Sequence, residues 1–458
     1  MTSRISRRSF IGAAALTGAS AALAACGGTP APASGGGEAA ATSAPAAATS
    51  ETVLEVWNNN WGEVYNEPMK AIGEAYTAET GVKVNWAFND QWQEKLLTAI
   101  AGDIPPDACY TNWVGLPTLA HQGTMLPLDD YFAASGIQSS DFIKAMIDAC
   151  VWEGKTYGIP GGADFLVLHY SKDVYEAVGL DPEQPPVTLA DWVAHSEAIY
   201  KFDSAGNIER MGMGPTDPGL IYAAFLFGGE FYNTEEKRIT CNEGGTVEAL
   251  EWMIENSQRW PVEKVAAFTA GMPGYSQPNS GFATGKVTYM YNGYWSAEAL
   301  DKYAPDLNYG LAFLPTLNGT PEERKNYVIQ GWDYSIPAGA KSPDAGWDFL
   351  KYGFYDNAAD LGVKTINGNC VLDQMDEYVK GVQEWLGPEN RMTPQFSVFT
   401  DTGAAGEKFW PVMPVASRYY DEVNRAQDFA TRGEMTAQEA LDEAARVTQE
   451  ELDSALKS

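Results

Sequence analysis

The sequence predicts an α/β protein with two globular lobes. Its 458 residues are too many for one typical hydrophobic core, and a hydrophobic content of 45% is too high for a disordered chain. From Val53 onward, short apolar runs with strand character alternate with segments of helical periodicity. Because this alternation is typical of sheets flanked by helices, we expect a helix-flanked sheet in the fold.

Three strands and two helices are expected at the start of the globular part. The strands lie at 53–57, 82–88 and 107–110, and one helix opens at Asn66 while Asp90 caps the next. Such a succession favours parallel pairing, which brings the carboxyl ends of the strands to one edge, where ligands usually bind. Those ends are residues 58–61, 90 and 111–113.

Two later helices have recognisable starts. Thr188 with Asp191, and Thr436 with Glu439, have the spacing of capping boxes. The second of these helices carries an apolar stripe as far as residue 455, so the C-terminal part is expected to be helical.

The net charge excludes nucleic-acid binding. The chain has 30 basic and 61 acidic residues, a formal charge of −31. A nucleic-acid-binding protein needs a basic surface to displace the counterions of phosphates. This acidic balance is typical of a solvated surface that keeps a protein soluble and monomeric.

Residues 1–25 are expected to be a signal peptide. Arg7 and Arg8 precede an Ala-rich apolar stretch, 11–25, which is too short to cross a hydrocarbon core of about 30 Å as a helix. The arginine pair followed by Phe10 resembles a twin-arginine export signal, which implies export of a folded protein. Leu23–Cys26 resembles a bacterial lipobox, so Cys26 is the expected lipidation site.

Residues 26–51 are expected to form a flexible tether, because Gly, Ala, Pro, Ser and Thr dominate a segment that cannot bury a core. Beyond the tether, four cysteines permit two disulfides in three connectivities. No spacing favours one connectivity, and the sequence is equally compatible with free thiols. These cysteines are Cys109, Cys150, Cys241 and Cys370.

A series of short segments occurs along the chain from Val53 onward, at 80–84, 106–107, 122–123, 126–131, 154–160, 169–173, 185–188, 282–286 and 292–295. In their order and spacing these segments resemble the extracellular solute-binding proteins of the maltose-binding-protein type. The resemblance covers nearly everything from Val53 onward.

The resemblance implies a two-lobed periplasmic-binding-protein fold, type II-like, with a ligand cleft between two α/β lobes. Lobe 1 would comprise residues 52–160 and 331–370, and lobe 2 would comprise 161–330 and 371–458. Closure of such lobes over a ligand is a two-state equilibrium that the ligand shifts by touching both sides. The implied function is capture of a sugar or oligosaccharide for the permease subunits and ATPase of an ABC importer. The implied location is extracytoplasmic, with contact to the cell membrane only through the lipid anchor.

The resemblance also implies an aromatic platform at Trp295, on which many family members stack a sugar ring. An indole face attracts the polarised C–H groups of a pyranose while the hydroxyls remain free to form hydrogen bonds. Further aromatic and polar residues lie in segments expected to face the cleft. The complete set of predicted ligand contacts is Asn59, Asn60, Trp61, Asp90, Thr111, Asn112, Trp113, Asp164, Trp295, Trp332, Asp333 and Asn369.

Catalytic, metal and cofactor sites have no pattern in the sequence. His121, His169 and His195 lack the spacing of a metal-binding pair, and no G-x-S-x-G motif is present. We therefore expect no cofactor, no metal and no enzymatic activity.

Two alternatives remain open. A cationic solute such as a polyamine would use Asp90, Asp164 and Asp333 as counter-charges beneath aromatic walls. A secreted glycan hydrolase lipoprotein is the alternative from another class. An anionic ligand is disfavoured, because the candidate loops lack arginine and lysine.

Overall fold

The computed structural model describes residues 53–365 and 367–457, which belong to a single unit of contacts. The predicted signal peptide, tether and Cys26 lie outside these residues. Among the described helices, none is both long and apolar enough to cross a membrane.

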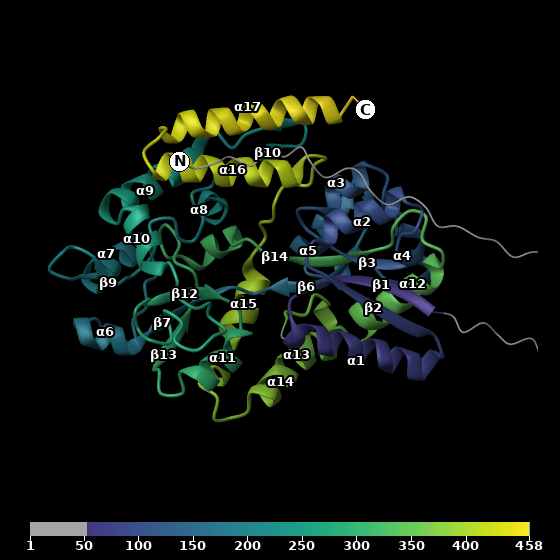
Figure 1. The fold of residues 1–458 in the computed structure, drawn as a ribbon, viewed down its shortest axis with the longest axis horizontal. Coiled ribbons are helices and arrows are strands. Elements are labelled where there is room, and N and C mark those ends of the chain that lie inside the picture. Colours follow the sequence, from purple (N-terminus) through teal and green to yellow (C-terminus); the bar gives the residue numbers. More distant parts are fainter. Residues whose placement is uncertain (1–52, 366, 458) are drawn as a thin grey trace, which may run out of the picture. The chain divides into compact units, whose positions relative to one another are not determined.

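A mixed five-stranded sheet organises the first lobe, with the strand order β2-β1-β3-β14-β6 (Figure 1). β1 pairs in parallel with β2 and β3, as the sequence predicts, whereas β14 runs antiparallel to both of its neighbours, β3 and β6. The sheet is therefore not purely parallel. Its strands are β1 (Val53–Asn59), β2 (Lys83–Asn89), β3 (Ala108–Asn112), β6 (Ile159–Asp164) and β14 (Gln330–Ser335).

Two helix starts differ from the prediction. The first helix begins at Glu63 rather than Asn66, and the second has Gln91 rather than Asp90 at its N-cap, with no side-chain cap bond. The helices and short strands of this lobe are α1 (Glu63–Thr80), α2 (Trp92–Ala101), α3 (Leu116–His121), α4 (Asp129–Ser135), η1 (Ser139–Asp141), α5 (Lys144–Ala149), β4 (Val151–Trp152), β5 (Lys155–Thr156), α12 (Pro343–Lys351), the π-helical η3 (Tyr352–Asp356) and α13 (Ala358–Thr365).

An antiparallel three-stranded sheet, in the order β12-β7-β13, organises the second lobe. The predicted capping box of Thr188 and Asp191 is confirmed at the start of α7. The elements of this lobe are β7 (Val167–Ser171), α6 (Lys172–Val178), α7 (Leu189–Ile199), β8 (Lys201–Phe202), β9 (Ile208–Arg210), α8 (Leu220–Leu226), β10 (Tyr232–Asn233), β11 (Arg238–Ile239), α9 (Gly244–Arg259), α10 (Val262–Thr269), β12 (Tyr289–Asn292), α11 (Ser296–Tyr303), β13 (Tyr309–Ala312) and η2 (Pro321–Asn326).

The chain passes from the first sheet to the second between β6 and β7, and it returns in β14. β6 pairs with β14 as far as Asp164, the last residue of the strand. β6 and β14 are therefore two connecting strands, and β6 ends where β14 begins, beside the second lobe (Figure 1).

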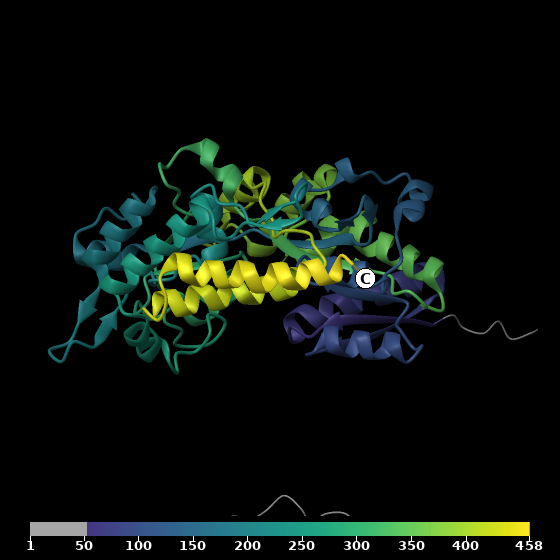
Figure 2. The same cartoon turned by 90° about the horizontal axis from the view of Figure 1, so that it is seen from above.

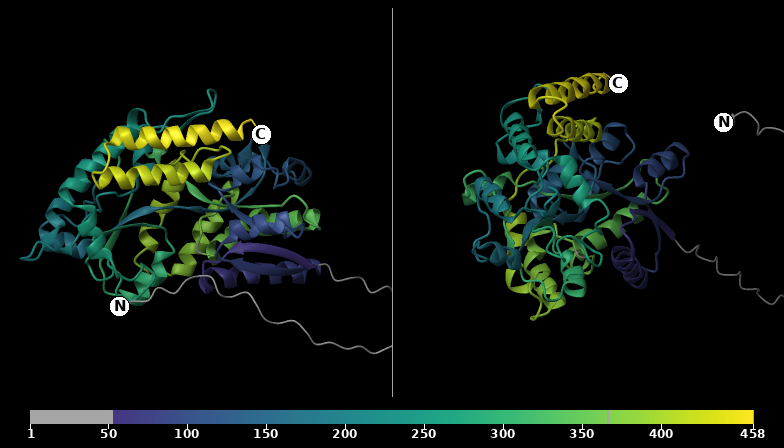
Figure 3. Two further views of the ribbon diagram at one scale, coloured as in Figure 1. Left: turned by 45° about the horizontal axis from the view of Figure 1, so that its top comes forward. Right: turned by 60° about the vertical axis from the view of Figure 1, so that its left-hand side comes forward.

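The C-terminal part is helical, as predicted, and the capping box of Thr436 and Glu439 is confirmed. α16 and α17 lie side by side and pack on α9 of the second lobe, and α16 also contacts α3 of the first (Figures 2 and 3). The elements after α13 are η4 (Leu372–Gln374), α14 (Met375–Leu386), η5 (Thr393–Gln395), α15 (Ser397–Ala405), α16 (Ala416–Thr431) and α17 (Ala437–Ala455).

All four cysteines of the described residues are free and buried in the hydrophobic cores, so no disulfide links them. Burial raises the pKa of each thiol, and that of Cys241 reaches about 12. The sequence was compatible with either disulfides or free thiols, and the structure has free thiols at all four positions.

Candidate functional site

A cavity of about 620 Å³ is lined by side chains from both lobes. Its walls are mainly aromatic, with a few polar groups among them. The aromatic side chains are Trp61, Tyr65, Tyr110, Trp113, Tyr275, Trp295, Tyr303 and Trp332, and the polar ones are Asn112, Asp164, Ser276, Glu298, Lys302, Thr365 and Asn367.

Four aromatic rings form the first-lobe wall of this cavity. The Trp61 ring lies 4.5 Å from Tyr65, 5.0 Å from Tyr110 and 5.1 Å from Trp332, measured between ring centroids. The contacts with the two tyrosines are edge-to-face, a favourable geometry for aromatic pairs. Trp61 is 39% exposed although it contacts three rings, so an apolar face is open to a ligand.

Trp332 fits into the sheet because its neighbour in the next strand is glycine. It pairs with Gly162 in β6, and a Cβ atom at Gly162 would lie 2.6 Å from the indole. A Cβ at Gly161 would lie 2.6 Å from Tyr334 and 3.1 Å from the Trp332 ring. The two glycines of this connecting strand therefore make room for aromatic rings.

Trp295 is positioned by the turn that ends β12. It is the N-cap residue of α11, and a Cβ atom at Gly293 would lie 2.2 Å from its ring. The indole thus lies directly against the backbone of Gly293. The helix that follows places Glu298 and Lys302 on the same cavity wall.

Asp164 is the deeply placed carboxyl group of the cavity. It ends β6, is partly open to the cavity and is otherwise enclosed by protein. Burial raises the pKa of this carboxyl to about 7, and a hydrogen bond from Gln330 offsets part of the effect. That bond is long, with 3.4 Å between Gln330 Nε2 and Asp164 Oδ2.

Six of the twelve predicted contacts line the cavity, namely Trp61, Asn112, Trp113, Asp164, Trp295 and Trp332. They come from three strand ends of the first sheet, the following loops, and the turn before α11. Asn112 also has a structural role, since its Oδ1 accepts a hydrogen bond from the Gly115 amide at 2.7 Å.

The other six predicted contacts do not line the cavity. Thr111 and Asp333 are buried between strands, where the Thr111 hydroxyl donates to the Asp333 carboxylate. Successive side chains of a strand point to opposite faces, so Tyr110 and Asn112 reach the cavity and Thr111 cannot. For the same reason, Trp332 lines the cavity while the next residue, Asp333, points to the opposite face of the sheet.

The remaining four lie at a strand end or in loops outside the cavity. The Asn60 amide donates to Asp90 Oδ1 at 2.8 Å, which joins two exposed loop residues outside the cavity. The backbone N–H of Asn59 donates to Asn58 Oδ1, and the Asn369 side chain bonds to the backbone N–H and carbonyl of Val371. Asn and Asp at strand ends commonly satisfy backbone groups in this way.

Nine aromatic or polar cavity residues were not predicted, and most lie on helices or long loops that strand-end reasoning does not reach. Tyr110 is the exception, because strand alternation from Asn112 would have found it. Lys302, on α11, adds a basic side chain to the site although the candidate loops have none. The missed set is Tyr65, Tyr110, Tyr275, Ser276, Glu298, Lys302, Tyr303, Thr365 and Asn367.

One of these missed residues has an unused hydrogen-bond donor. Asn367 is 7% exposed, and its Nδ2 atom has no hydrogen-bond partner among the described residues. A buried amide without a partner is costly, so this donor is suited to an acceptor atom brought by a ligand.

An aromatic cavity between two α/β lobes, joined by two strands, defines a two-lobed binding protein. The family described as bacterial extracellular solute-binding protein matches residues 58–354. That range is well over half of the chain, and the chain belongs to this family.

Named relatives agree with this membership. The maltooligosaccharide ABC transporter solute-binding lipoprotein of Streptococcus pneumoniae (strain ATCC BAA-255 / R6) is 26% identical over 305 residues, which cover 63% of this chain and 66% of that protein. The maltodextrin-binding protein MdxE of Bacillus subtilis (strain 168) is 24% identical over 366 residues, covering 74% of this chain and 79% of that protein.

Solved structures agree on the fold. CpMnBP1 with mannobiose bound has a TM-score of 0.71 and 25% sequence identity, covering 86% of this chain and 99% of that chain. The cyclic alpha-maltosyl-1,6-maltose binding protein from Arthrobacter globiformis has a TM-score of 0.69 and 20% identity, covering 88% and 99%.

Proposed function

We propose that this protein binds a neutral sugar or short oligosaccharide in the cavity and delivers it to an ABC importer. The observation that carries the proposal is the aromatic lining contributed by both lobes, with the Trp295 indole on one side and Trp61 and Trp332 on the other. Sugar rings stack on such faces while their hydroxyls bond to polar groups at the edges. The volume of about 620 Å³ lies within the range of small-molecule sites, roughly 300–1,000 Å³.

The names of related proteins support a carbohydrate ligand. Two relatives are described as maltooligosaccharide- and maltodextrin-binding, and one solved neighbour contains mannobiose. We extend this ligand class to the present chain, without choosing between linkages.

The remaining parts of the proposal concern how the protein is used. It acts as a monomeric receptor, breaks no bond in its ligand, and docks on permease subunits driven by an ATPase. Lipidation of Cys26 anchors it outside the cytoplasm, and residues 26–51 serve as the tether. The family membership and the lipobox resemblance at 23–26 support this arrangement.

A cationic ligand is the rival within this fold, and the structure weakens it. Of the three acids that would serve as counter-charges, Asp90 and Asp333 do not line the cavity. Only Asp164 remains at depth, and Lys302 adds a positive charge to the same lining.

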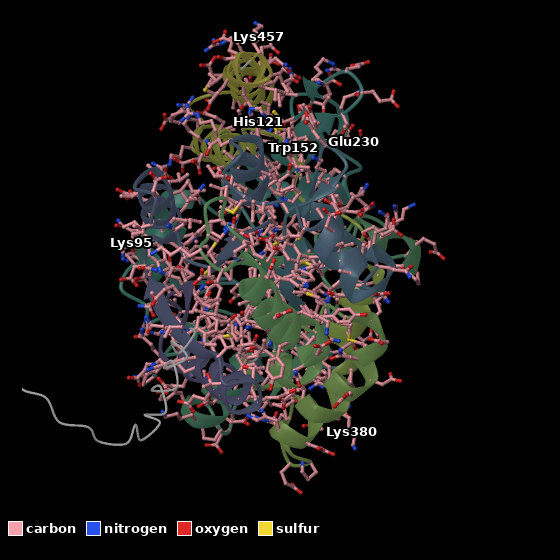
Figure 4. All side chains as sticks on the ribbon, turned by 90° about the vertical axis from the view of Figure 1, so that its right-hand side faces the viewer. Lys95, His121, Trp152, Glu230, Lys380 and Lys457 are labelled. Atoms are coloured by element: carbon pink, nitrogen blue, oxygen red, sulfur yellow. The ribbon has the colours of Figure 1, made fainter. Side chains whose placement is uncertain are left out.

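Calorimetric titration with mannobiose and maltotetraose tests the proposed function. The titration compares the wild type with the variant Trp295→Ala. Loss of the indole face should weaken sugar binding by at least about tenfold, equivalent to roughly 1.4 kcal/mol. The matched control is Trp152→Ala, since Trp152 lies against His121 in the first lobe and outside the cavity (Figure 4).

Equal affinity in the Trp295 variant and the wild type would exclude the platform. Chemical turnover of either sugar would overturn the receptor function and favour the hydrolase alternative.

A further inference from the structure

Asp164 is placed where a hydrogen-bonding partner is missing. An ionised carboxylate has two oxygens that together accept about four hydrogen bonds. The described residues offer this one a single amide, Gln330 Nε2, at the long distance of 3.4 Å. The rest of the carboxyl opens onto the cavity.

The side-chain amide of Gln330 is oriented by a hydrogen bond from the second lobe. The Tyr222 hydroxyl of α8 donates to Gln330 Oε1 at 2.7 Å, which fixes the orientation of the side chain and turns Nε2 toward Asp164. Gln330 and Asp164 face each other across the two connecting strands, β14 and β6. The carboxyl is therefore positioned at the junction of the lobes.

No opposite charge compensates this carboxyl from the elements around it. The described groups that its charge influences come from α1, β3, α8, β12, and the loops holding residues 275, 294 and 370. All of them are neutral at pH 7, because the ordinary pKa of a tyrosine or cysteine lies above about 7 and burial raises it further. They are Tyr65, Tyr110, Tyr222, Tyr275, Tyr291, Tyr294 and Cys370.

The two other charged groups of the cavity, Glu298 and Lys302, lie on one helix of the second lobe. Neither contributes to the pKa shift of Asp164, which has only burial and the Gln330 amide as causes. The carboxyl therefore carries an unpaired charge when ionised and holds a proton when the cavity is empty and the pH is low.

We propose that ligand hydroxyl groups supply the partners missing from Asp164, so that sugar binding expels the proton of this carboxyl and the affinity depends on pH. This deepens the proposed function and rests on it. Hydrogen bonds donated to a carboxylate are charge-assisted, and a ligand that makes them selects the ionised form. Its proton passes to the buffer, and no covalent bond of the ligand changes.

The sign of the pH dependence follows from the direction of the pKa shift. With a pKa of about 7 in the free protein, Asp164 is mostly protonated at pH 5 and ionised above pH 8. For a ligand that requires the ionised form, the free energy of binding includes the cost of deprotonating Asp164, and this cost is appreciable only below the pKa. The affinity should fall about tenfold for each pH unit from 7 down to 5, and it should be level above pH 8.

The experiment is calorimetric titration of the wild-type chain with mannobiose and maltotetraose, between pH 5 and pH 8.5. At pH 6, titrations in two buffers of different ionisation enthalpy should show the release of close to one proton per sugar bound. This measurement needs no variant, so it does not depend on how a substituted chain folds.

Asp164→Asn identifies the group. The amide keeps the shape and one acceptor oxygen but cannot ionise, so the variant should bind the sugar weakly, with an affinity that no longer changes with pH.

Asp333→Asn is the matched control. Asp333 is a buried carboxyl on the adjacent strand whose pKa burial also raises to about 7, but it does not line the cavity. This variant should keep the full pH dependence of sugar binding.

The outcomes separate this inference from the proposed function. Sugar binding with the same affinity at pH 5 and pH 8, or a pH slope that persists in Asp164→Asn, overturns the inference and leaves the sugar receptor intact. Failure of both sugars to bind at every pH, with binding of a diamine instead, overturns the proposed function itself.

Discussion

Asp164 and Asp333 are carboxyls on neighbouring strands, and burial raises the pKa of both to about 7. Their surroundings nevertheless differ. Asp333 is 1% exposed, and its carboxyl group accepts a hydrogen bond from the Thr111 hydroxyl. Asp164 has one weak partner and an opening to the cavity. Both residues therefore have a raised pKa. Only the geometry distinguishes them, because Asp164 is open to a ligand in the cavity and Asp333 is bonded within the sheet.

Asp333→Asn should change how stability depends on pH. An aspartate in the unfolded chain has a pKa of about 3.9, so between about pH 4 and 7 the unfolded chain gives up a proton that folded Asp333 keeps. This difference destabilises the wild type as the pH rises, by at most about 1.4 kcal/mol per pH unit. The asparagine variant lacks this component while its amide oxygen still accepts from Thr111.

Urea denaturation at pH 5, 6, 7 and 8 measures the effect. The free energy of unfolding of the variant, relative to the wild type, should increase steadily from pH 5 to 7 and then level off. A difference that is constant across this range would show that Asp333 is ionised in the folded protein at pH 5.

At the scale of elements, glycines in strand β6 and in the turn after β12 determine where two cavity tryptophans, Trp332 and Trp295, lie. The Gly161-Gly162 pair in β6 accommodates the Trp332 ring, and Gly293 after β12 lies against Trp295. Neither contact requires an unusual backbone conformation, since none of these glycines has a left-handed φ. The requirement is space, because a methyl group would overlap the indole.

Gly293→Ala should therefore weaken sugar binding although every cavity side chain is retained. The Trp295 ring must move away from the new Cβ atom, at a cost of about 1–3 kcal/mol in stability, and its face is displaced from the ligand. Calorimetric titration should show an affinity close to that of Trp295→Ala.

Gly274→Ala serves as the comparison, because a Cβ atom there meets open space next to the cavity residue Tyr275. Unchanged sugar affinity in the Gly293 variant would mean that Trp295 does not act through its position on this turn.

At the scale of the whole described unit, a second contact between the lobes lies next to the cavity. Trp113 of the first lobe lines the cavity and packs edge-to-face on Tyr420 of α16, with 5.8 Å between ring centroids. Beside it, the Ser417 hydroxyl donates to the Val114 carbonyl at 3.3 Å. α16 therefore supports one wall of the ligand site from behind.

Tyr420→Ala should reduce sugar affinity by up to about tenfold, because an aromatic pair contributes roughly 0.5–1.5 kcal/mol and Trp113 loses its support. Phe429→Ala is the control on the same helix, since Phe429 contacts Arg425 rather than the first lobe. Equal losses in both variants, measured by titration, would indicate a general effect on α16 instead.

The fold was largely accessible from the sequence, and more than half of the candidate site was not. Alternation of strands and helices predicted the parallel core of the first sheet, and two capping boxes marked the starts of α7 and α17. The resemblance implied a return of the chain to lobe 1 from residue 331, but the antiparallel pairing of β14 was not predicted, because pairing between segments some 200 residues apart leaves no local pattern.

The errors in the site have similar causes. Predicting consecutive residues such as Thr111 with Asn112 ignored the alternation of side chains in a strand. Tyr275 and Lys302 reach the cavity only through tertiary packing, so no motif near them marks their role.

The four buried thiols have a consequence for assembly of the native state. Since Cys109, Cys150, Cys241 and Cys370 are free, no oxidation reaction among them has to accompany folding. The described cores are complete without an oxidant, so the described part of the chain can reach its native fold under reducing as well as oxidising conditions.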